Sequence, residues 1–224
     1  MSKVFNSIIA SGFADIVSAA GFVGSNLVGA SIGGALDRLA AGRAERARTI
    51  FLEELGQGLR PPRDAGEIDE FVSIVYRYMS KAAEGAARLN LRLMAKVARG
   101  QLEGEGLYAS EFLRYSEMIA SLTREEVILL ATRFAVRREY EAAKKTSDWN
   151  DTSKINDVVR DRLVPSVFPT GAHMTAALTA LQRTGLVWPA AATLGGGYVW
   201  QDTPLLDHIV CLAGFEAALA TEAN

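Results

Sequence analysis

The residues whose types and spacing best suit chemistry are His208 and Cys211, which lie three positions apart with Asp207 beside them. On a helix this spacing places the imidazole and the thiol on one face, where they could hold a metal ion or form a base and nucleophile pair. A metal would need further ligands from elsewhere, and the chain has only two histidines and one cysteine. We therefore interpret Cys211 as a buried structural residue and His208 as a surface or capping residue.

Other catalytic signals are equally thin. The glycine run 195–197 has neither GxGxxG spacing nor a GK[ST] sequence, so it predicts no nucleotide-binding loop. His173, Glu125 and Glu126 fall in the first turns of predicted helices, where the helix dipole accounts for the two acids without catalysis. The sequence therefore predicts a protein that is not an enzyme and has no cofactor and no metal site.

Composition places the chain among ordinary globular proteins. It has 224 residues, of which 49% are hydrophobic and 22% charged, and this balance excludes the disordered and collagen-like classes. A single cysteine cannot close an intrachain disulfide, which favours the cytoplasm. The net charge of −2 calls for no nucleic-acid partner, so any such partner would have to bind a local patch.

Four small residues, Gly21, Ser25, Gly29 and Gly33, recur at intervals of four within the uncharged segment 16–36. On a helix they form one stripe that allows a second helix to approach closely, so they predict a glycine zipper and a homo-oligomer. The 21 residues of the segment are long enough to span a bilayer, but they are diluted by five glycines. The alternative is a glycine-rich helix that packs against the core of the same chain.

Four arginines follow this segment, and the only acids among them are Asp37 and Glu45. The arginines are Arg38, Arg43, Arg46 and Arg48. They predict contact with anionic lipid headgroups and would lie on the cytoplasmic side of an inserted segment. The predicted location is cytoplasmic, either peripheral to the inner membrane or conditionally inserted in it. The alternative is an ordinary solvated face.

Helical periodicity continues through most of the chain. We expect a helix over 39–56, a long one over 68–102 and a short one over 110–119. The long helix gathers basic side chains on the side opposite its apolar face. These side chains are Arg77, Lys81, Arg88, Arg92, Lys96 and Arg99. The favoured interpretation is that acidic neighbours balance them in the fold, and the alternative is that they bind a membrane, an acidic partner or phosphates. The acids suggested for this balance are Glu67, Asp69 and Glu70, or Glu103, Glu105 and Glu111.

The order of elements changes after residue 122. Thr123 and Glu126 form a capping box that opens a helix, and helices over 154–163 and 170–183 follow. A glycine-joined hairpin over 186–201 and a last helix from Thr203 complete the order found in winged-helix modules. The predicted fold is mainly α, a multi-helix protein with a C-terminal winged-helix-like module carrying one small β-hairpin. Its predicted parts are a glycine-rich segment 1–56, a helical middle 67–120 and the module 121–224.

The net charge of this module argues against sequence-specific binding to DNA. From Leu163 to Asn224 the one basic residue, Arg183, faces four acids, for a net charge of −3. The helix expected to read bases offers mainly Ala, Leu, Thr and Met. The sequence therefore predicts no specific binding to duplex DNA and favours an interaction module or a structural lid.

Two segments carry a family resemblance. The stretch 112–130, with Thr123, Glu125 and Glu126, and the string ALTALQRTGLV over 177–187 resemble the Abi-alpha family of bacteria and phages, an abortive-infection-type group. The resemblance covers roughly residues 35–215 and brings no catalytic motif. Together with the glycine stripe and the arginines that follow it, the resemblance predicts a non-enzymatic, self-associating, membrane-acting effector or accessory protein of abortive-infection type, with a protein partner still to be identified. The alternatives are a transcriptional or nucleic-acid-associated adaptor and a structural component of a larger assembly.

Overall fold

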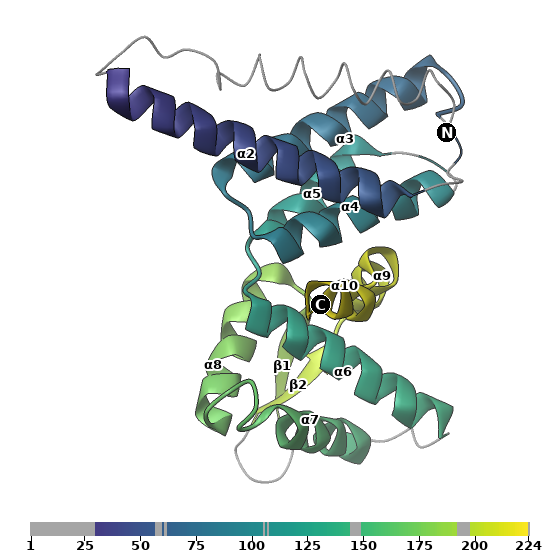
Figure 1. Ribbon diagram of the computed structural model, residues 1–224. Helices are drawn as coiled ribbons and strands as arrows, with labels where there is room; N and C mark the ends of the chain where they lie inside the picture. Colours follow the sequence, from purple (N-terminus) through teal and green to yellow (C-terminus); the bar gives the residue numbers. More distant parts are fainter. Residues whose placement is uncertain are drawn as a thin grey trace. The chain divides into compact units, whose positions relative to one another are not determined.

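The computed structural model describes residues 30–56, 60, 62–104, 106, 108–143, 149–191 and 198–223. These residues are mainly helical, with a two-stranded antiparallel sheet near the C-terminus (Figure 1). The predicted mainly α fold with a small hairpin is thus confirmed. The chain divides into two compact units, Met1–Ser121 and Leu122–Asn224.

The described part of the first unit is a bundle of helices (Figure 1). Its members are α2 (Ala30–Leu55), α3 (Ala65–Glu84), α4 (Arg88–Glu103) and α5 (Ala109–Ala120). Helix α2 packs on α3 and α4, and both of these pack on α5. The ring of Phe51 in α2 lies 4.7 Å from that of Tyr78 and 6.3 Å from that of Phe71 in α3, so aromatic contacts anchor α2 on the bundle.

The single long helix predicted over 68–102 is wrong, because the chain breaks between α3 and α4. Gly85 has a φ of 99°, in the left-handed region that favours glycine. Its amide donates to the Ala82 carbonyl at 3.1 Å and the Ala86 amide donates to the Lys81 carbonyl at 3.0 Å, which closes the end of α3. Apolar residues continue at helical spacing across the break, and so periodicity alone predicted one helix.

The second unit follows the predicted winged-helix order. Helices α6 (Arg124–Ala142), α7 (Trp149–Leu163) and α8 (Gly171–Leu181) come first, and α8 continues into the 3₁₀ turn η1 (Gln182–Thr184). Strands β1 (Val187–Ala191) and β2 (Tyr198–Asp202) then pair antiparallel, with Val187 opposite Asp202. The last segment divides at Gly214, where φ is 54°, into α9 (Pro204–Ala213) and α10 (Phe215–Ala223).

Local capping signals behave as expected in two of three places. The capping box of α6 is confirmed, since the Glu126 amide donates to the Thr123 hydroxyl at 3.2 Å and the Thr123 amide to the Glu126 carboxylate at 2.8 Å. Thr170 likewise caps α8. Thr203 occupies the N-cap of α9, but its hydroxyl donates to the Gly185 carbonyl at 2.8 Å and so ties α9 to the start of the hairpin.

Candidate anion-binding site

The predicted self-association stripe falls largely outside the described residues. Gly21, Ser25 and Gly29 precede the first described residue, whereas Gly33 lies in α2. Close helix approach at this stripe therefore stays a prediction.

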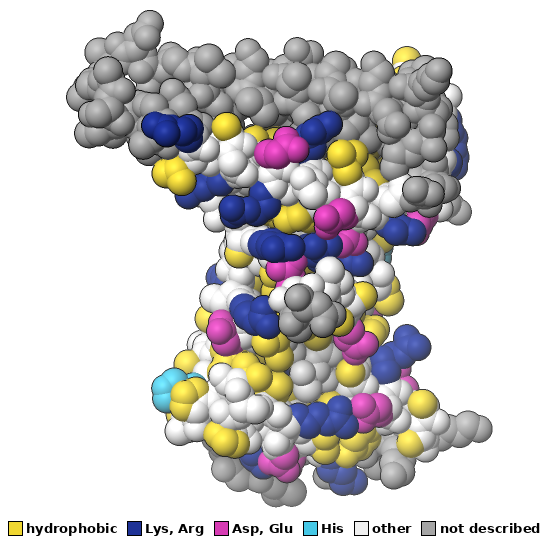
Figure 2. Space-filling view, viewed as in Figure 1, with side chains coloured by type: hydrophobic (Ala, Val, Ile, Leu, Met, Phe, Trp, Pro, Cys, Tyr) yellow, Lys and Arg dark blue, Asp and Glu magenta, His cyan; other side chains and the backbone are white. Residues whose placement is uncertain are grey.

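The four arginines predicted to contact headgroups lie on α2. Arg38, Arg43 and Arg46 are exposed, while Arg48 is partly buried and pairs with Glu45 at 3.4 Å. We call Arg38, Arg43, Arg46 and Arg48 the arginine surface. Figure 2 shows Lys and Arg side chains gathered over the region of α2 and α4, interspersed with acidic ones.

The other side of α2 is already used by the fold. Ala44, Ala47, Ile50 and Phe51 are buried, and the Tyr78 hydroxyl donates to the Ala47 carbonyl at 2.9 Å. Because an α-helix turns by about 100° per residue, burying this side directs Arg38 and Arg46 outward and leaves Arg48 at its edge. Arg43 falls on the same side as Ala47 and is nevertheless exposed. Over this stretch α2 therefore offers a membrane mainly charge, together with the exposed side chain of Leu39.

Two arginines of this surface also line a cavity at the turn between α3 and α4. The cavity has a volume of about 260 Å³. It is lined by residues of α2, of the turn and of the adjoining ends of α3 and α4. These residues are Arg43, Arg46, Ala82, Gly85, Ala86, Ala87, Arg88 and Leu91. We call it the arginine cavity. The Arg43 guanidinium donates to the Ala83 carbonyl at 3.4 Å, which holds it beside the turn.

The backbone adds to the positive potential of this cavity. Helix α4 begins at Arg88, and its N-cap residue Ala87 makes no side-chain capping bond. No acidic residue lies in the first turn. The amide groups at a helix start and the positive end of its dipole attract anions, so this helix end and the three arginines act in the same direction.

Most of the remaining basic side chains of the first unit form ion pairs with acids of the same unit. Arg92 is 3% exposed and pairs with Glu54 and Glu53 of α2, and Lys96 lies 2.9 Å from the same Glu54. Lys81 lies 2.8 Å from both Glu84 and Glu117. Acidic side chains balance these three residues, as predicted, but they are Glu53, Glu54, Glu84 and Glu117 and not the acids that the sequence suggested. Those neighbours come chiefly from α2 and α5, which sequence spacing could not identify.

In the second unit Arg133 is almost completely buried and holds three elements together. Its guanidinium donates to Asp202 at 2.6 Å, to the Asn156 side chain at 3.0 Å and to the Trp200 carbonyl at 2.9 Å. These bonds join α6 to α7 and to β2.

The neighbouring basic residues of this unit are also paired. Arg137 pairs with Asp207, and Arg183 bonds both carboxylate oxygens of Glu126, at 2.9 and 3.0 Å. Hydrogen bonding to Glu126 raises the pKa of Arg183. Arg183, the one Lys or Arg between Leu163 and Asn224, is therefore paired with an acid in the first turn of α6.

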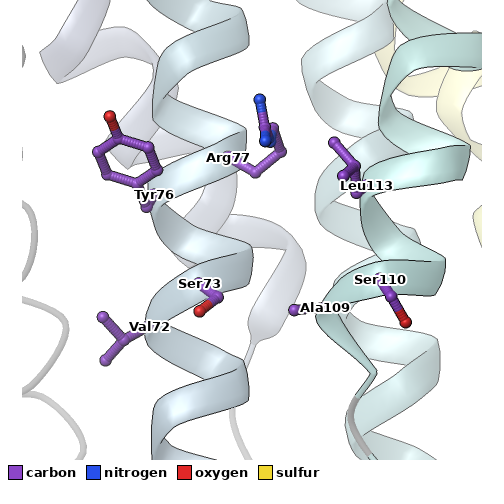
Figure 3. Close-up of a pocket in the computed structure, with 7 residues that line it drawn as sticks. All are labelled: Val72, Ser73, Tyr76, Arg77, Ala109, Ser110 and Leu113. Atoms are coloured by element: carbon purple, nitrogen blue, oxygen red, sulfur yellow. The ribbon is translucent and has the colours of Figure 1, made fainter.

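An apolar cavity of about 460 Å³ lies between α3 and α5. Val72, Ser73, Tyr76 and Arg77 line it from α3, and Ala109, Ser110 and Leu113 line it from α5 (Figure 3). Arg77 and Leu113 project toward the space between the two helices (Figure 3). Among its described lining residues there is no histidine, cysteine or carboxylate, so this part of the lining suits an apolar group and brings no acid, base or nucleophile together.

The structure corrects the interpretation of Cys211, which is exposed. Leu206, Ile209, Val210 and Ala213 form the buried face of α9, and at helical spacing Cys211 falls outside that face. We therefore expect its thiol to be labelled readily in the native protein, not slowly. Among the described residues no three His, Cys, Asp or Glu side chains gather where they could hold a metal ion.

Within the described part of the chain, no single helix has both the length and the apolar character to cross a bilayer. The pair Pro204–Ala213 and Phe215–Glu222, bent by 47°, meets the same criteria of length and composition when taken together.

The resemblance to the Abi-alpha family stays a prediction. No family model, curated protein or solved structure matches this chain.

Proposed function

We propose that this protein is a non-enzymatic, self-associating protein that binds anionic membrane surfaces through the arginine surface of α2. The observation that carries the proposal is the exposure of Arg38, Arg43 and Arg46 on a helix whose apolar side is occupied by the core. Basic residues near an anionic leaflet contribute about 1 kcal/mol each to binding. The contact is electrostatic and peripheral.

Self-association supplies the second part of the proposal. A stripe formed by Gly21, Ser25, Gly29 and Gly33 would bring copies together and multiply a weak surface contact by avidity. Together with the resemblance to abortive-infection proteins, this points to an effector or accessory protein at the inner membrane that acts when a trigger exposes the glycine-rich segment.

Sedimentation with vesicles tests the surface. The protein should sediment with vesicles of equal parts phosphatidylcholine and phosphatidylserine, and not with phosphatidylcholine alone. Binding should weaken as salt is raised, because salt screens exposed charges. The triple variant Arg38→Gln, Arg43→Gln, Arg46→Gln should lose binding, whereas Arg114→Gln, an exposed arginine on α5, should retain it. Equal binding by the two variants would refute the proposal.

A second experiment tests self-association. Gly29→Leu and Gly33→Leu place bulk in the stripe, whereas Ser31→Leu places it outside. Leucine favours helix over glycine by up to about 1 kcal/mol, so a smaller oligomer in the two glycine variants could not result from a weaker helix. If analytical ultracentrifugation finds all three variants as associated as the parent, the stripe does not mediate association.

A second candidate function is a nucleic-acid-associated adaptor. It is favoured by the order of elements in the second unit, which is helix, helix, helix, hairpin, helix. The charges weigh against it, since Arg133, Arg137 and Arg183 are all paired with acids within that unit. Fluorescence anisotropy with labelled duplex DNA at physiological salt tests it. Submicromolar, sequence-dependent binding would favour the adaptor over the membrane protein.

A further inference from the structure

We infer that the outer face of α3 is a contact surface between two copies of this chain, which pack α3 against α3 in opposite directions. This contact deepens the self-association of the proposed function and uses residues outside the glycine stripe. It rests on the proposed function only in requiring that copies of the chain associate, so either contact can fail without the other.

Exposed apolar side chains concentrate at this face. Six large apolar side chains are exposed among the described residues, and four of them lie on α3 or at the start of α5. Ile68, Val72 and Tyr76 are spaced by four residues and form a row along α3, with exposures of 37, 40 and 47%. Val72 and Tyr76 project from the same side of the helix (Figure 3), and the fourth side chain, Tyr108, is 57% exposed. A cluster of this kind is typical of an interaction surface.

The cavity between α3 and α5 lies at the same face. The two helices run in the same direction, because the Glu70 carboxylate near the start of α3 accepts a hydrogen bond from the Ala109 amide at the start of α5. Near their other ends, Lys81 of α3 lies 2.8 Å from Glu117 of α5. Small side chains line part of the cavity and leave room for an aromatic ring of another copy. They are Ser73, Ala109 and Ser110.

The charges of this face identify a second copy as the occupant. Asp69 is exposed and Arg77 is partly exposed, and neither forms an ion pair with any residue that the structure describes. They lie eight residues apart, roughly 12 Å along the axis, and about 80° apart around it, so they share one face. If two copies are related by a twofold axis at Ser73, Asp69 of each copy meets Arg77 of the other. Parallel packing in register would instead place like charges together.

Charge reversal with mixing tests this contact on the full chain. Asp69→Arg leaves two arginines on the face and Arg77→Asp leaves two aspartates, so each single variant repels its own copy. An equimolar mixture of the two variants restores both ion pairs between unlike chains, and the double variant restores them between like chains. The matched control is Arg138→Asp, a reversal at an exposed arginine on α6. Sedimentation equilibrium measures the dissociation constant, and circular dichroism verifies folding.

We expect each single reversal to weaken dimerisation about thirtyfold, because the dimer loses two surface ion pairs and gains two like-charge contacts. The mixture, the double variant and Arg138→Asp should associate as the parent does. Tyr76→Ser should also weaken dimerisation, by about tenfold, because it removes a buried aromatic ring from each side of the contact. Trp188→Ser, at a similarly exposed aromatic residue of the second unit, should not.

The glycine variants separate this contact from the glycine stripe. With Gly29→Leu and Gly33→Leu combined, the chain should remain a dimer, and adding Asp69→Arg should make it a monomer. Dissociation by the charge reversals but not by the glycine variants would refute the stripe and support the α3 contact.

Two results would overturn the inference. In the first, association depends on the glycine stripe and is unchanged by reversal at Asp69 or Arg77, which leaves the proposed function standing. In the second, the single reversals weaken association but neither their mixture nor the double variant recovers it, because the two charges then do not meet across the contact. A parent chain that is monomeric at every concentration would refute both contacts.

Discussion

Two sets of arginines, one in each unit, have opposite surroundings. In the second unit Arg133, Arg137 and Arg183 are bonded to Asp202, Asp207 and Glu126, so their charges hold α6, β2, α9 and η1 in place. In the first unit Arg43, Arg46 and Arg88 are exposed and line a cavity whose described lining residues include no acid. The comparison teaches that a count of basic residues does not locate a binding surface, because an acid paired with a buried arginine offsets the attraction of that arginine for a ligand.

Among the variants that test this contrast, we expect Arg133→Met to lower the unfolding free energy most. Arg133→Met removes the guanidinium that lies 2.6 Å from Asp202 and leaves this carboxylate, which is 4% exposed, with only the Arg137 guanidinium at 3.8 Å. Removing one partner of a buried ion pair costs about 3–5 kcal/mol of unfolding free energy. All three tryptophans, at positions 149, 188 and 200, lie in the second unit, so urea unfolding followed by tryptophan fluorescence measures this unit alone.

The matched control for that experiment is Arg138→Met on the same helix, where the side chain is exposed. It should change the unfolding free energy by no more than about 0.5 kcal/mol. Equal losses in the two variants would mean that the Arg133 ion pair does not hold the unit together.

The reverse pattern is expected for the double variant Arg43→Gln, Arg46→Gln. Its unfolding free energy should stay within about 0.5 kcal/mol of the parent, because both side chains are exposed. Its affinity for phosphatidylserine vesicles should fall by about 2 kcal/mol, or about thirtyfold, at about 1 kcal/mol per arginine. A destabilisation as large as that of Arg133→Met would break the comparison, since these arginines would then be structural too.

An intermediate effect is expected at the start of α6. Thr123→Ala removes the hydroxyl that caps the helix and should cost about 1 kcal/mol. Glu126→Ala also removes the acceptor of Arg183 and should cost about 1–2 kcal/mol. Tryptophan fluorescence again reports the unit concerned. The Arg183 pair would contribute nothing if the two variants proved equally stable.

The smallest effect is a pH dependence at Glu67 in the first unit. Hydrogen bonds from the Arg60 guanidinium and the Arg63 amide lower the pKa of this carboxyl below its ordinary 4.5. A lowered folded-state pKa stabilises the fold above pH 4.5, and this stabilisation is lost as the pH falls through 4.5 toward the folded-state value. Glu67→Gln should therefore flatten the dependence of thermal stability on pH in the acid range, as scanning calorimetry would detect. An unchanged acid profile would contradict this assignment.

Local signals in the sequence were sufficient for most elements. The Thr123 and Glu126 pair predicted the start of α6, and Thr170 predicted the start of α8, because a cap and its helix are only three residues apart. The Val- and Trp-rich stretches flanking Gly195–Gly197 predicted the hairpin, because its two strands are also close together in the sequence. The arginines of α2 were also visible as a cluster, since they lie close together in the sequence.

What the sequence could not determine depends on residues far apart in the chain. The partners of Arg133 lie 23 to 69 positions away, and Arg88 meets Arg43 and Arg46 only because α3 ends at Gly85 and α4 packs on α2. The exposure of Cys211 likewise depends on which side of α9 the fold buries. Composition and periodicity describe each helix by itself, whereas pairing and burial are decided when helices pack, because only then do distant charges compete for the same partners.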